Sequence, residues 1–277
     1  MPTPAVRTSE RRPTPRHTVR VGSVSFLNAK PLIYGLEHDP AVELSLEVPS
    51  RLLDGMRDRR YDVALLPVID YQRMEGLRLL TAGGIGCDGP TLTVRIFSRV
   101  PIEQVKTLAC DTDSHTSVAL ARVLCAELYG AVPEMVPLTR DTLTGADDSS
   151  AVLLIGDKVV SEEPPGFPHQ VDLGEAWKRL TGLPFLFAAW MARDGVELYD
   201  LPERLERART AGLENVERIV AREAPPRRWP LDVAHRYLTE HLRFDVGPDQ
   251  LRAVERFHQL AHRHGVLRDP PRPIVAQ

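Results

Sequence analysis

The sequence predicts an α/β protein built as two lobes. From Val19 onward, short apolar runs typical of strands alternate with stretches whose apolar residues recur at helical spacing. The alternation runs through two successive blocks, the second beginning after Pro101, and from Leu201 only helical periodicity remains. Alternating strands and helices favour parallel sheets covered by helices, and two such blocks favour two lobes. We expect a flexible tail over 1–17, a first lobe from 18–100 and 195–277, and a second lobe from 101–194.

The first block contains five expected strands and two expected helices. The strands are Val19–Ser25, Leu44–Val48, Tyr61–Val68, Leu77–Ala82 and Leu92–Phe97. A helix is expected over Asn28–Glu37, with Asn28 as its N-cap and Pro31 in its first turn, where a missing N–H is tolerated. Ser50 is expected to cap the next helix. Four glycines between the last two strands indicate tight or closely approached backbone: Gly83, Gly84, Gly86 and Gly89.

The second block repeats the alternation, and the C-terminal part is helical. Its expected strands are Val105–Cys110, Ala151–Ile155 and Phe185–Met191, and its expected helices are Thr116–Tyr129 and Leu173–Leu180. Gly130 follows the first of these helices and is expected to end it. Three further helices are expected over Pro202–Glu223, Leu231–Phe244 and Pro248–His264, separated by Pro225-Pro226 and Gly247-Pro248.

Composition excludes several classes of function. Hydrophobic residues make up 43% of the chain and charged residues 26%, as in ordinary soluble proteins. The net charge of -3 gives no general attraction to nucleic acid or anionic membranes, and no apolar run is long enough to span a bilayer. The basic N-terminus lacks the apolar core of a secretory signal. Three cysteines without CxxC spacing argue against disulfides or structural zinc, so we expect a cytoplasmic protein with Cys125 in its core.

The loops that follow strands are the expected place for a ligand, because open α/β sheets bind ligands at the carboxyl ends of their strands. Ser25 and Asn28 lie in the first such loop, where exposed N–H groups suit an anion, although Asn28 serves equally well as a simple cap. The second loop contains Gly89, Pro90, Thr91 and Thr93. Glycine there would let a ligand approach the backbone, and an ordinary turn is the alternative.

A run of hydroxyls marks the third loop, at the start of the helix expected from Thr116. The hydroxyls belong to Ser114, Thr116 and Ser117, and His115 lies among them. Hydroxyls at a helix N-terminus can hold a carboxylate or phosphate, and the alternative is an N-cap with more hydroxyls than it needs. Asp111 and Asp113 would repel an anion and are therefore expected to point away. Asp157 ends a buried strand in a fourth loop, and Phe185 follows a fifth loop that could form a cleft wall or a simple turn.

Other motifs indicate ordinary structure. His258 and His262 have the spacing of a metal-binding pair, but no acidic residue completes an HExxH pattern, so a solvated helix face and no metal are expected. P-loop, GxGxxG and GxSxG motifs are absent from the sequence, which argues against nucleotide binding and serine hydrolysis.

Several segments together resemble the chorismate dehydratase (MqnA) family. They are Val21–Leu32, Gly86–Pro90, Thr116–Val118, Val152–Asp157, Asp172–Gly174, Trp177 and Thr181–Phe185. They span most of the chain, and their order and spacing carry the resemblance. It implies a type II periplasmic-binding-protein fold with a ligand cleft between lobes, used as a cytoplasmic hydro-lyase without a cofactor. The implied reaction is the first step of the futalosine route to menaquinone, in which chorismate loses water to give 3-[(1-carboxyvinyl)oxy]benzoate.

The resemblance also implies site residues. Asn28 and Thr93 match the polar positions at the reacting ring, where the family often has serine in place of Thr93. Ser114, Thr116 and Ser117 match a carboxylate-binding helix start. The remaining expected contacts to a small dicarboxylate substrate are Ser25, Gly89, Pro90, Thr91, His115, Asp157 and Phe185.

The proton acceptor and the function each have alternatives. Because the matched positions are polar but weakly basic, we expect the enolpyruvyl carboxylate of the substrate to take the proton, with Asp157 as the alternative base. Two other functions fit the same fold. One is a cytosolic clamshell that binds or senses a small carboxylate without catalysis. The other is the sister naphthoate synthase, whose start looks unlike Ser25–Asn28.

Overall fold

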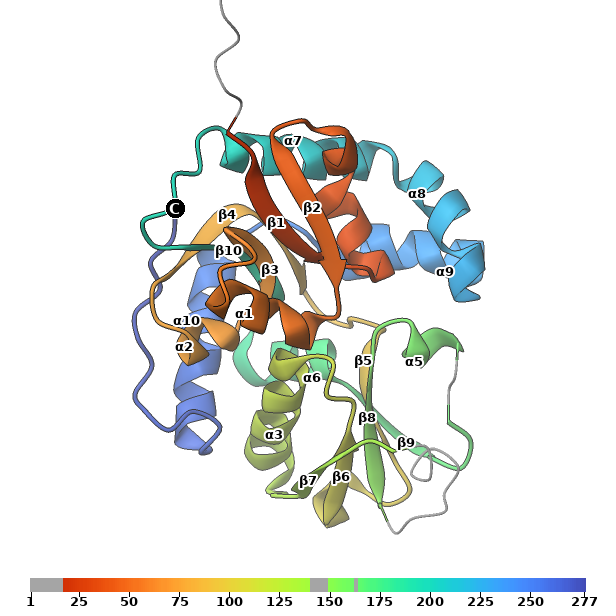
Figure 1. Cartoon of the computed structure of the whole chain (residues 1–277). Coiled ribbons are helices and arrows are strands. Elements are labelled where there is room, and N and C mark those ends of the chain that lie inside the picture. Colours follow the sequence, from red (N-terminus) through yellow and green to blue (C-terminus); the bar gives the residue numbers. More distant parts are fainter. Residues whose placement is uncertain (1–16, 140–148, 162–163) are drawn as a thin grey trace, which may run out of the picture.

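Two β-sheets form the two lobes of the protein (Figure 1). The computed structural model describes residues 17–139, 149–161 and 164–277, so the expected tail lies outside it except for His17. The larger sheet has the order β11-β4-β10-β3-β1-β2 and the smaller sheet β7-β6-β8-β5-β9. The strands are β1 (Val19–Val24), β2 (Val42–Glu47), β3 (Val63–Pro67), β4 (Leu77–Cys87), β5 (Val94–Ser98), β6 (Thr107–Cys110), β7 (Glu134–Pro137), β8 (Ala151–Ile155), β9 (His169–Asp172), β10 (Phe185–Arg193) and β11 (Leu242–Arg243). The expected two-lobed α/β class is confirmed.

Helices cover both sheets. The α-helices are α1 (Pro49–Arg57), α2 (Asp70–Arg73), α3 (His115–Tyr129), α5 (Lys158–Ser161), α6 (Leu173–Thr181), α7 (Leu201–Glu214), α8 (Val216–Glu223), α9 (Leu231–Arg236) and α10 (Pro248–Arg263). The 3-10 helices are η1 (Leu27–Ile33), η2 (Leu36–His38), η3 (Ile102–Gln104) and η4 (Pro225–Arg227), and η5 (Tyr237–His241) is a π-helix. In the larger lobe α1, α7 and α10 pack on the sheet, and α10 also contacts α3 of the smaller lobe.

Both sheets are mixed, whereas the alternation of strands and helices predicts parallel sheets. In the larger sheet β1 pairs with β2 and β3 in parallel, but β10 lies antiparallel between β3 and β4. In the smaller sheet β6 pairs in parallel with β7 and β8, whereas β5 pairs antiparallel with β8 and β9. The difference arises at β5 and β10, the strands that follow the two passages between sheets, because the chain enters each sheet from the other one.

The chain passes between the sheets twice, and the passages differ from the expected lobe boundaries. β4 ends at Cys87 in the larger sheet and β5 begins at Val94 in the smaller one, so the strand expected in the first lobe belongs to the second sheet. The chain returns through α6, and β10 pairs with β3 and β4 of the larger sheet, although its sequence was assigned to the second lobe. Apolar runs reveal that these segments are buried strands, but they do not reveal which sheet receives them.

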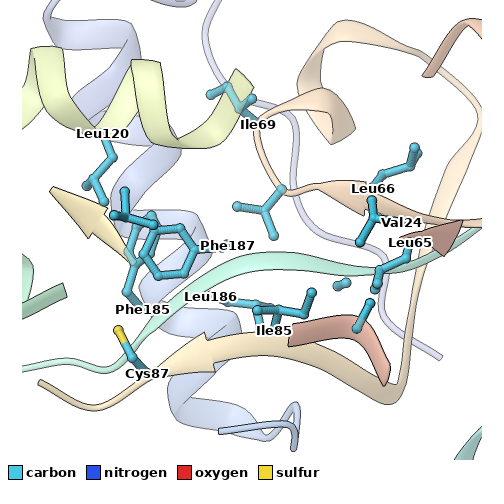
Figure 2. Close-up of a cluster of buried hydrophobic side chains, with 14 of the residues drawn as sticks. Val24, Leu65, Leu66, Ile69, Ile85, Cys87, Leu120, Phe185, Leu186 and Phe187 are labelled. Atoms are coloured by element: carbon cyan, nitrogen blue, oxygen red, sulfur yellow. The ribbon is translucent and has the colours of Figure 1, made fainter. Parts of the chain in front are cut away.

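One hydrophobic core extends through both lobes, and Figure 2 shows part of it, with Leu120 of α3 and Phe187 of β10 pointing toward one another. Three aromatic rings tie α6, β10 and α10 together: the ring centroid of Phe185 lies 5.1 Å from that of Trp177 and 5.2 Å from that of Phe257. Both contacts are edge-to-face, the geometry that aromatic pairs prefer. These rings therefore fix the smaller lobe against the larger one.

Three of the four glycines expected between strands lie within β4. β4 continues to Cys87, so Gly83, Gly84 and Gly86 are all part of it. A Cβ atom on Gly84 would lie 2.6 Å from the carbonyl oxygen of Ala188 in the neighbouring strand. The expected close approach of backbone is therefore present, and the strand continues beyond its expected end at Ala82, to Cys87.

The first expected helix is a 3-10 helix that begins at Leu27, with Phe26 as its N-cap. Pro31 lies inside it, and its missing N–H removes one of the hydrogen bonds that a regular α-helix would need. Asn28 therefore lies in the first turn and is not the cap. α1 likewise begins at Pro49, one residue before the expected cap at Ser50.

The C-terminal helices are shorter than periodicity predicts. The helix expected over Pro202–Glu223 is interrupted at Asn215, which separates α7 from α8. The helix expected over Leu231–Phe244 becomes α9, the π-helix η5 and the short strand β11. The short strands β7 and β9 were not expected, because four residues carry too little periodicity to predict a strand.

Asp62 ties β1 to β10 just before β3 begins. Its carboxylate accepts hydrogen bonds from Arg20 (Nη2 to Oδ1, 2.7 Å) and Arg193 (Nη2 to Oδ1, 2.8 Å). Burial by itself would raise the pKa of Asp62, but the hydrogen bonds from Arg20, together with that from Arg193, outweigh burial and hold the pKa below its ordinary value of 3.8. The carboxylate therefore stabilises the fold in its charged form.

We expect Asp62→Asn to lower the free energy of unfolding at pH 7 by about 2 kcal/mol, because the carboxylate is the shared charged acceptor of a partly exposed Arg20 and a largely buried Arg193. The folded-state pKa lies below the unfolded-state value, so this stabilisation is complete above pH 3.8 and is lost as pH falls through the folded-state pKa. Urea unfolding at several pH values measures it.

Asp54→Asn is the matched control, because Asp54 is 65% exposed and pairs only with Arg57 on the same helix. Its effect on unfolding should stay below about 0.5 kcal/mol. An Asp62→Asn effect as small as that of the control, or one that does not shrink in acid, would contradict the assignment.

Candidate active site

A cavity lies between the two lobes, at the carboxyl ends of β1, β3 and β8. Its apolar lining comes mainly from the larger lobe and comprises Val24, Phe26, Pro49, Leu65, Pro67, Ile85, Val94, Ile155, Phe187, Ala188 and Leu242, with Gly156 beside them. Its polar lining comprises Asn28, Thr91, Thr93, Ser114, Ser117 and Tyr237. Figure 2 labels three of these apolar lining residues, Val24, Leu65 and Ile85, which belong to strands of the larger sheet. The position agrees with the expectation that ligand-binding loops follow strands.

The polar lining is uncharged. Among the described residues that line the cavity, none has a carboxylate, an ammonium, a guanidinium or an imidazole side chain. The polar groups are hydroxyls of serine, threonine and tyrosine and one side-chain amide. Such groups orient a ligand by hydrogen bonds but are poor bases at neutral pH.

Asn28 faces the cavity with an acceptor that has no partner. The 3-10 turn of η1 makes no side-chain cap, so the amide is not used to hold the backbone. Asn28 Oδ1 is buried and has no hydrogen-bond partner in the described part of the chain. A buried carbonyl oxygen of this kind costs free energy unless a ligand or water supplies a donor. The interpretation of Asn28 as a simple helix cap is therefore wrong.

Thr93 reaches the cavity from the passage between β4 and β5. It is 2% exposed, and its Oγ1 lies 2.8 Å from the hydroxyl of Tyr237. Thr91, two residues earlier, also lines the cavity, and its backbone N–H donates to Asp172 Oδ1 at 2.9 Å. Asp172 also caps α6, so a single buried carboxylate holds this loop to the helix.

The polar side chains at the start of α3 make two kinds of contact: some line the cavity, and others contact the larger lobe. Ser114 is the N-cap, and Ser117 Oγ donates to Ser114 Oγ at 3.1 Å, with both serines lining the cavity. Thr116 Oγ1 instead accepts a hydrogen bond from the backbone N–H of Ile69 in the other lobe. The N-terminus of a 15-residue helix thus points at the cavity and favours negative charge there.

His115 belongs to the contact between lobes and not to the cavity lining. Its Nδ1 lies 2.9 Å from a carboxylate oxygen of Asp70, which is fully buried and also receives Arg73 at 3.2 Å. His115 and Thr116 were expected to contact the substrate, and the structure places both against the first turn after β3. A helix start exposes side chains in several directions, and the sequence does not say which of them face a neighbouring lobe.

Asp157 also lies outside the cavity lining. Its Oδ2 is 3.3 Å from Arg227, a residue of the larger lobe, and Arg227 pairs in turn with Glu223 at 2.7 Å. Glu223 receives Lys30 as well, at 3.4 Å. Burial raises the pKa of Asp157, and the charge of Arg227 opposes that shift. These four residues form a charged cluster that joins the lobes beside the cavity.

The remaining expected site residues lie around the cavity. Ser25 is exposed, and its carbonyl accepts from Arg227 at 2.7 Å. Pro90 is exposed, and its carbonyl lies 3.2 Å from Nδ1 of His241. The backbone of Gly89 packs closely against Gly174. A Cβ atom on Gly174 would lie 2.5 Å from the carbonyl oxygen of Gly89. Phe185 is packed in the aromatic core, and Phe187, which contacts it edge-on, lines the cavity in its place.

Asp111 and Asp113 lie with Lys158, whose Nζ is 2.6 Å and 3.0 Å from their carboxylates. Neither lines the cavity, as expected. Tyr237 is the polar lining residue that sequence reasoning missed. It lies in an amphipathic helical stretch, where a tyrosine is ordinarily part of the core, so no local signal distinguishes it.

The histidines of α10 do not share a solvated face. His258 is 1% exposed, its Nε2 lies 2.9 Å from the carbonyl oxygen of Val68, and burial lowers its pKa to about 4. The expected solvated face is therefore wrong for His258. His262 instead faces the carbonyl oxygen of Leu267. In the described residues no group of three His, Cys, Asp or Glu side chains is placed to hold a metal ion.

All three cysteines are free and buried, and burial raises the pKa of each thiol to about 12. The expectation that Cys125 is part of the core is confirmed. Such thiols are protonated at neutral pH and are not activated nucleophiles. No helix in the part of the chain that the structure describes has the length and apolar character needed to span a membrane.

Comparison with solved structures identifies the fold. A protein from Archaeoglobus fulgidus has a TM-score of 0.74 at 16% identity, covering 91% of this chain and 100% of that one. The periplasmic aliphatic sulphonate binding protein SsuA from Escherichia coli has a TM-score of 0.62 at 14% identity, with 92% and 95% covered. A Candida albicans protein with the generic periplasmic binding protein fold has a TM-score of 0.63 at 13% identity, with 91% of each chain covered. The expected periplasmic-binding-protein-like fold is confirmed.

Sequence comparison identifies the family. A chorismate dehydratase from Thermus thermophilus is 30% identical over 224 residues, which cover 74% of this chain and 81% of the relative. The family model described as menaquinone biosynthesis matches residues 19–263, which include every residue of the cavity lining. By both comparisons, this chain belongs to the menaquinone biosynthesis family.

Proposed function

We propose that this protein is a chorismate dehydratase, a hydro-lyase that converts chorismate into 3-[(1-carboxyvinyl)oxy]benzoate and water. The observation that carries the proposal is the cavity between the lobes. It combines a buried amide acceptor without a described partner, a buried hydroxyl pair and a helix N-terminus, and its described lining residues have no charged side chain. The Thermus thermophilus relative is a chorismate dehydratase, which supports the assignment.

The cavity matches the chemical groups of chorismate. The substrate has a cyclohexadiene ring with one carboxylate, an enolpyruvyl ether with a second carboxylate, and a ring hydroxyl beside the ether. The start of α3, with Ser114 and Ser117, supplies donors and positive dipole for a carboxylate. The apolar lining, including Phe187 and Ile85, suits the ring, and Asn28 and Thr93 are the polar groups for the ring hydroxyl.

The reaction depends more on the position of the substrate than on a strongly acidic or basic side chain. The C–H bond on the ether-bearing carbon breaks, the C–O bond of the neighbouring hydroxyl breaks, and a new C=C bond forms between the two carbons. Conjugation to the ring carboxylate acidifies that hydrogen, and the product gains aromatic stabilisation. The proton and the hydroxide leave together as water, so no oxidant or reductant is required. A site that orients the substrate and excludes water supplies what remains.

We infer that the enolpyruvyl carboxylate of chorismate is the base. Among the described residues of the cavity lining, none has an ionised side chain that could take the proton. Asp157, the protein alternative, lies outside the lining and is paired with Arg227 at 3.3 Å. In this scheme Asp157 holds the lobes together, and Asn28 and Thr93 orient the ring and the leaving hydroxyl. No metal or organic cofactor enters the reaction, and the substrate chemistry fits a cytoplasmic enzyme.

The first test of this function is the conversion of chorismate by the purified protein. Purified protein treated with a chelator should convert chorismate into a product lighter by one water, with the proton NMR pattern of a 3-substituted benzoate. Heat-denatured protein is the control for spontaneous decay of chorismate. Folded protein that binds chorismate but leaves it unchanged would favour a sensing clamshell. Formation of a naphthoate from the cyclic futalosine derivative would favour the sister synthase.

The second prediction separates the two candidate bases. Asp157→Asn should retain kcat to within about 10-fold, because Asp157 acts on lobe contacts, whereas removal of a general base costs about 100-fold or more. Asn28→Ala, measured beside it, should lose roughly 100-fold in kcat, as removal of an oriented polar group in a water-excluded site typically does. Steady-state kinetics at saturating chorismate give both values, and a loss at Asp157 equal to that at Asn28 would assign the base to the protein.

The third prediction concerns the carboxylate site at the start of α3. Ser117→Ala should raise KM for chorismate by roughly 10-fold, because it removes a hydrogen-bonding group from the expected carboxylate site. Ser98→Ala is the matched control. Its hydroxyl is also buried, but it donates to the carbonyl of Val100 away from the cavity. An unchanged KM in Ser117→Ala, or an equal rise in both variants, would place the carboxylate elsewhere.

A further inference from the structure

Tyr237 is a buried polar residue at which the two lobes meet in the cavity wall. It is 1% exposed and belongs to the π-helix η5 of the larger lobe, yet its hydroxyl lies 2.8 Å from Oγ1 of Thr93 on the passage into the smaller sheet. Both residues line the cavity. A phenylalanine would fill the same space, so the hydroxyl needs its own explanation.

The tyrosine ring is held rigidly. The indole of Trp229 packs on it with ring centroids 5.1 Å apart. The π-helical turn widens the backbone at this point, and just after it β11 pairs with β4 at Cys87. Turns of this kind inside helices are frequently found at functional sites. The hydroxyl of Tyr237 therefore has a fixed position from which it can orient other groups.

Asn28 acts on the same hydroxyl. Burial raises the pKa of Tyr237, and hydrogen bonding from the side chains of Thr93 and Asn28 opposes that shift. The tyrosine thus stays protonated at neutral pH. The nitrogen of the Asn28 amide is the end that can donate to a phenol oxygen, whereas Oδ1 can only accept. Oδ1 is the buried acceptor that has no partner among the described residues.

We propose that Tyr237 is a positioning residue of the reaction. Its hydroxyl holds Oγ1 of Thr93 and the amide nitrogen of Asn28, and it thereby leaves Asn28 Oδ1 free as the acceptor offered to the ring hydroxyl of the substrate. This inference rests on the proposed function. It extends that function because Tyr237, a residue of the larger lobe, would orient the side chains of both Thr93 and Asn28.

The test compares Tyr237→Phe with Tyr71→Phe. Each substitution removes one buried phenol hydroxyl, but that of Tyr71 bonds to the carbonyl of Pro273 and the N–H of Val275, outside the cavity. Tyr237→Phe should lower kcat by roughly 10-fold or more with KM changed less than about 3-fold, because the carboxylates that dominate binding are untouched. Tyr71→Phe should lower the melting temperature but leave kcat unchanged. A Tyr237→Phe enzyme with the kcat of the wild type would overturn the inference.

A double-mutant cycle with Thr93→Val shows whether Tyr237 acts through its neighbour. The double variant should lose clearly less than the product of the two single losses in kcat, because each substitution disables the same arrangement. Independent losses would mean that Tyr237 does not act through Thr93, and would overturn the inference. Thr93→Ser keeps the hydroxyl and should retain activity with Tyr237 present, but should gain nothing over Thr93→Val in the Tyr237→Phe background.

Two further results keep the inference distinct from the proposed function. Wild-type protein that leaves chorismate unchanged would overturn the function and this inference with it, whereas an active wild type beside a fully active Tyr237→Phe variant overturns the inference alone. Should Tyr237→Phe fail to fold, 3-fluorotyrosine at position 237 keeps the shape and strengthens the hydroxyl as a donor. A changed kcat at constant KM then supports the positioning role, and an unchanged kcat contradicts it.

Discussion

The insertion of β10 between β3 and β4 is the constraint on which the rest of the molecule depends. The chain leaves the larger sheet after β4, builds the smaller sheet, and then returns to the middle of the larger one. The smaller lobe is thus held at both ends, and the aromatic contacts of Phe185 with Trp177 and Phe257 fasten it to the strand that brings the chain back. The same strand delivers Phe187 and Ala188 to the cavity, so the central pairing of the sheet and the wall of the site are set together.

Charged side chains lie beside the cavity, and the described cavity lining contains none. The buried carboxylate of Asp70 faces His115 and Arg73, and Asp157 faces Arg227, so each acidic group near the lobe contact has a cationic partner. Pairing of this kind makes buried charge tolerable and restricts how the lobes can meet. Among the described residues, the cavity is lined by hydroxyls, an amide and a helix N-terminus, and a helix N-terminus favours an anion. A substrate that keeps its own ionised carboxylates there can use one of them as the base.

Proteins of the same fold indicate that the fold alone does not specify a dehydration reaction. The Escherichia coli sulphonate binding protein shares the fold at 14% identity, and its name describes binding without reaction. A clamshell supplies a cavity between lobes and a helix start that favours anions. We propose that in this chain the step from binding to reaction depends on three polar residues of the cavity lining, Asn28, Thr93 and Tyr237, which come from both lobes.

The sequence alone determined the α/β class, most strands, the helix at α3 and the family, because apolar periodicity and ordered motifs are local properties of the chain. It also pointed to Asn28, Thr93, Ser114 and Ser117, which the structure brings to one cavity. Only the tertiary structure decided that β5 belongs to the smaller sheet and β10 to the larger one. It also decided that His115, Thr116 and Asp157 contact the other lobe. Tyr237 likewise became visible only through its contact with Thr93, 144 positions away in the sequence. Such pairings depend on how distant segments pack, and no local pattern encodes them.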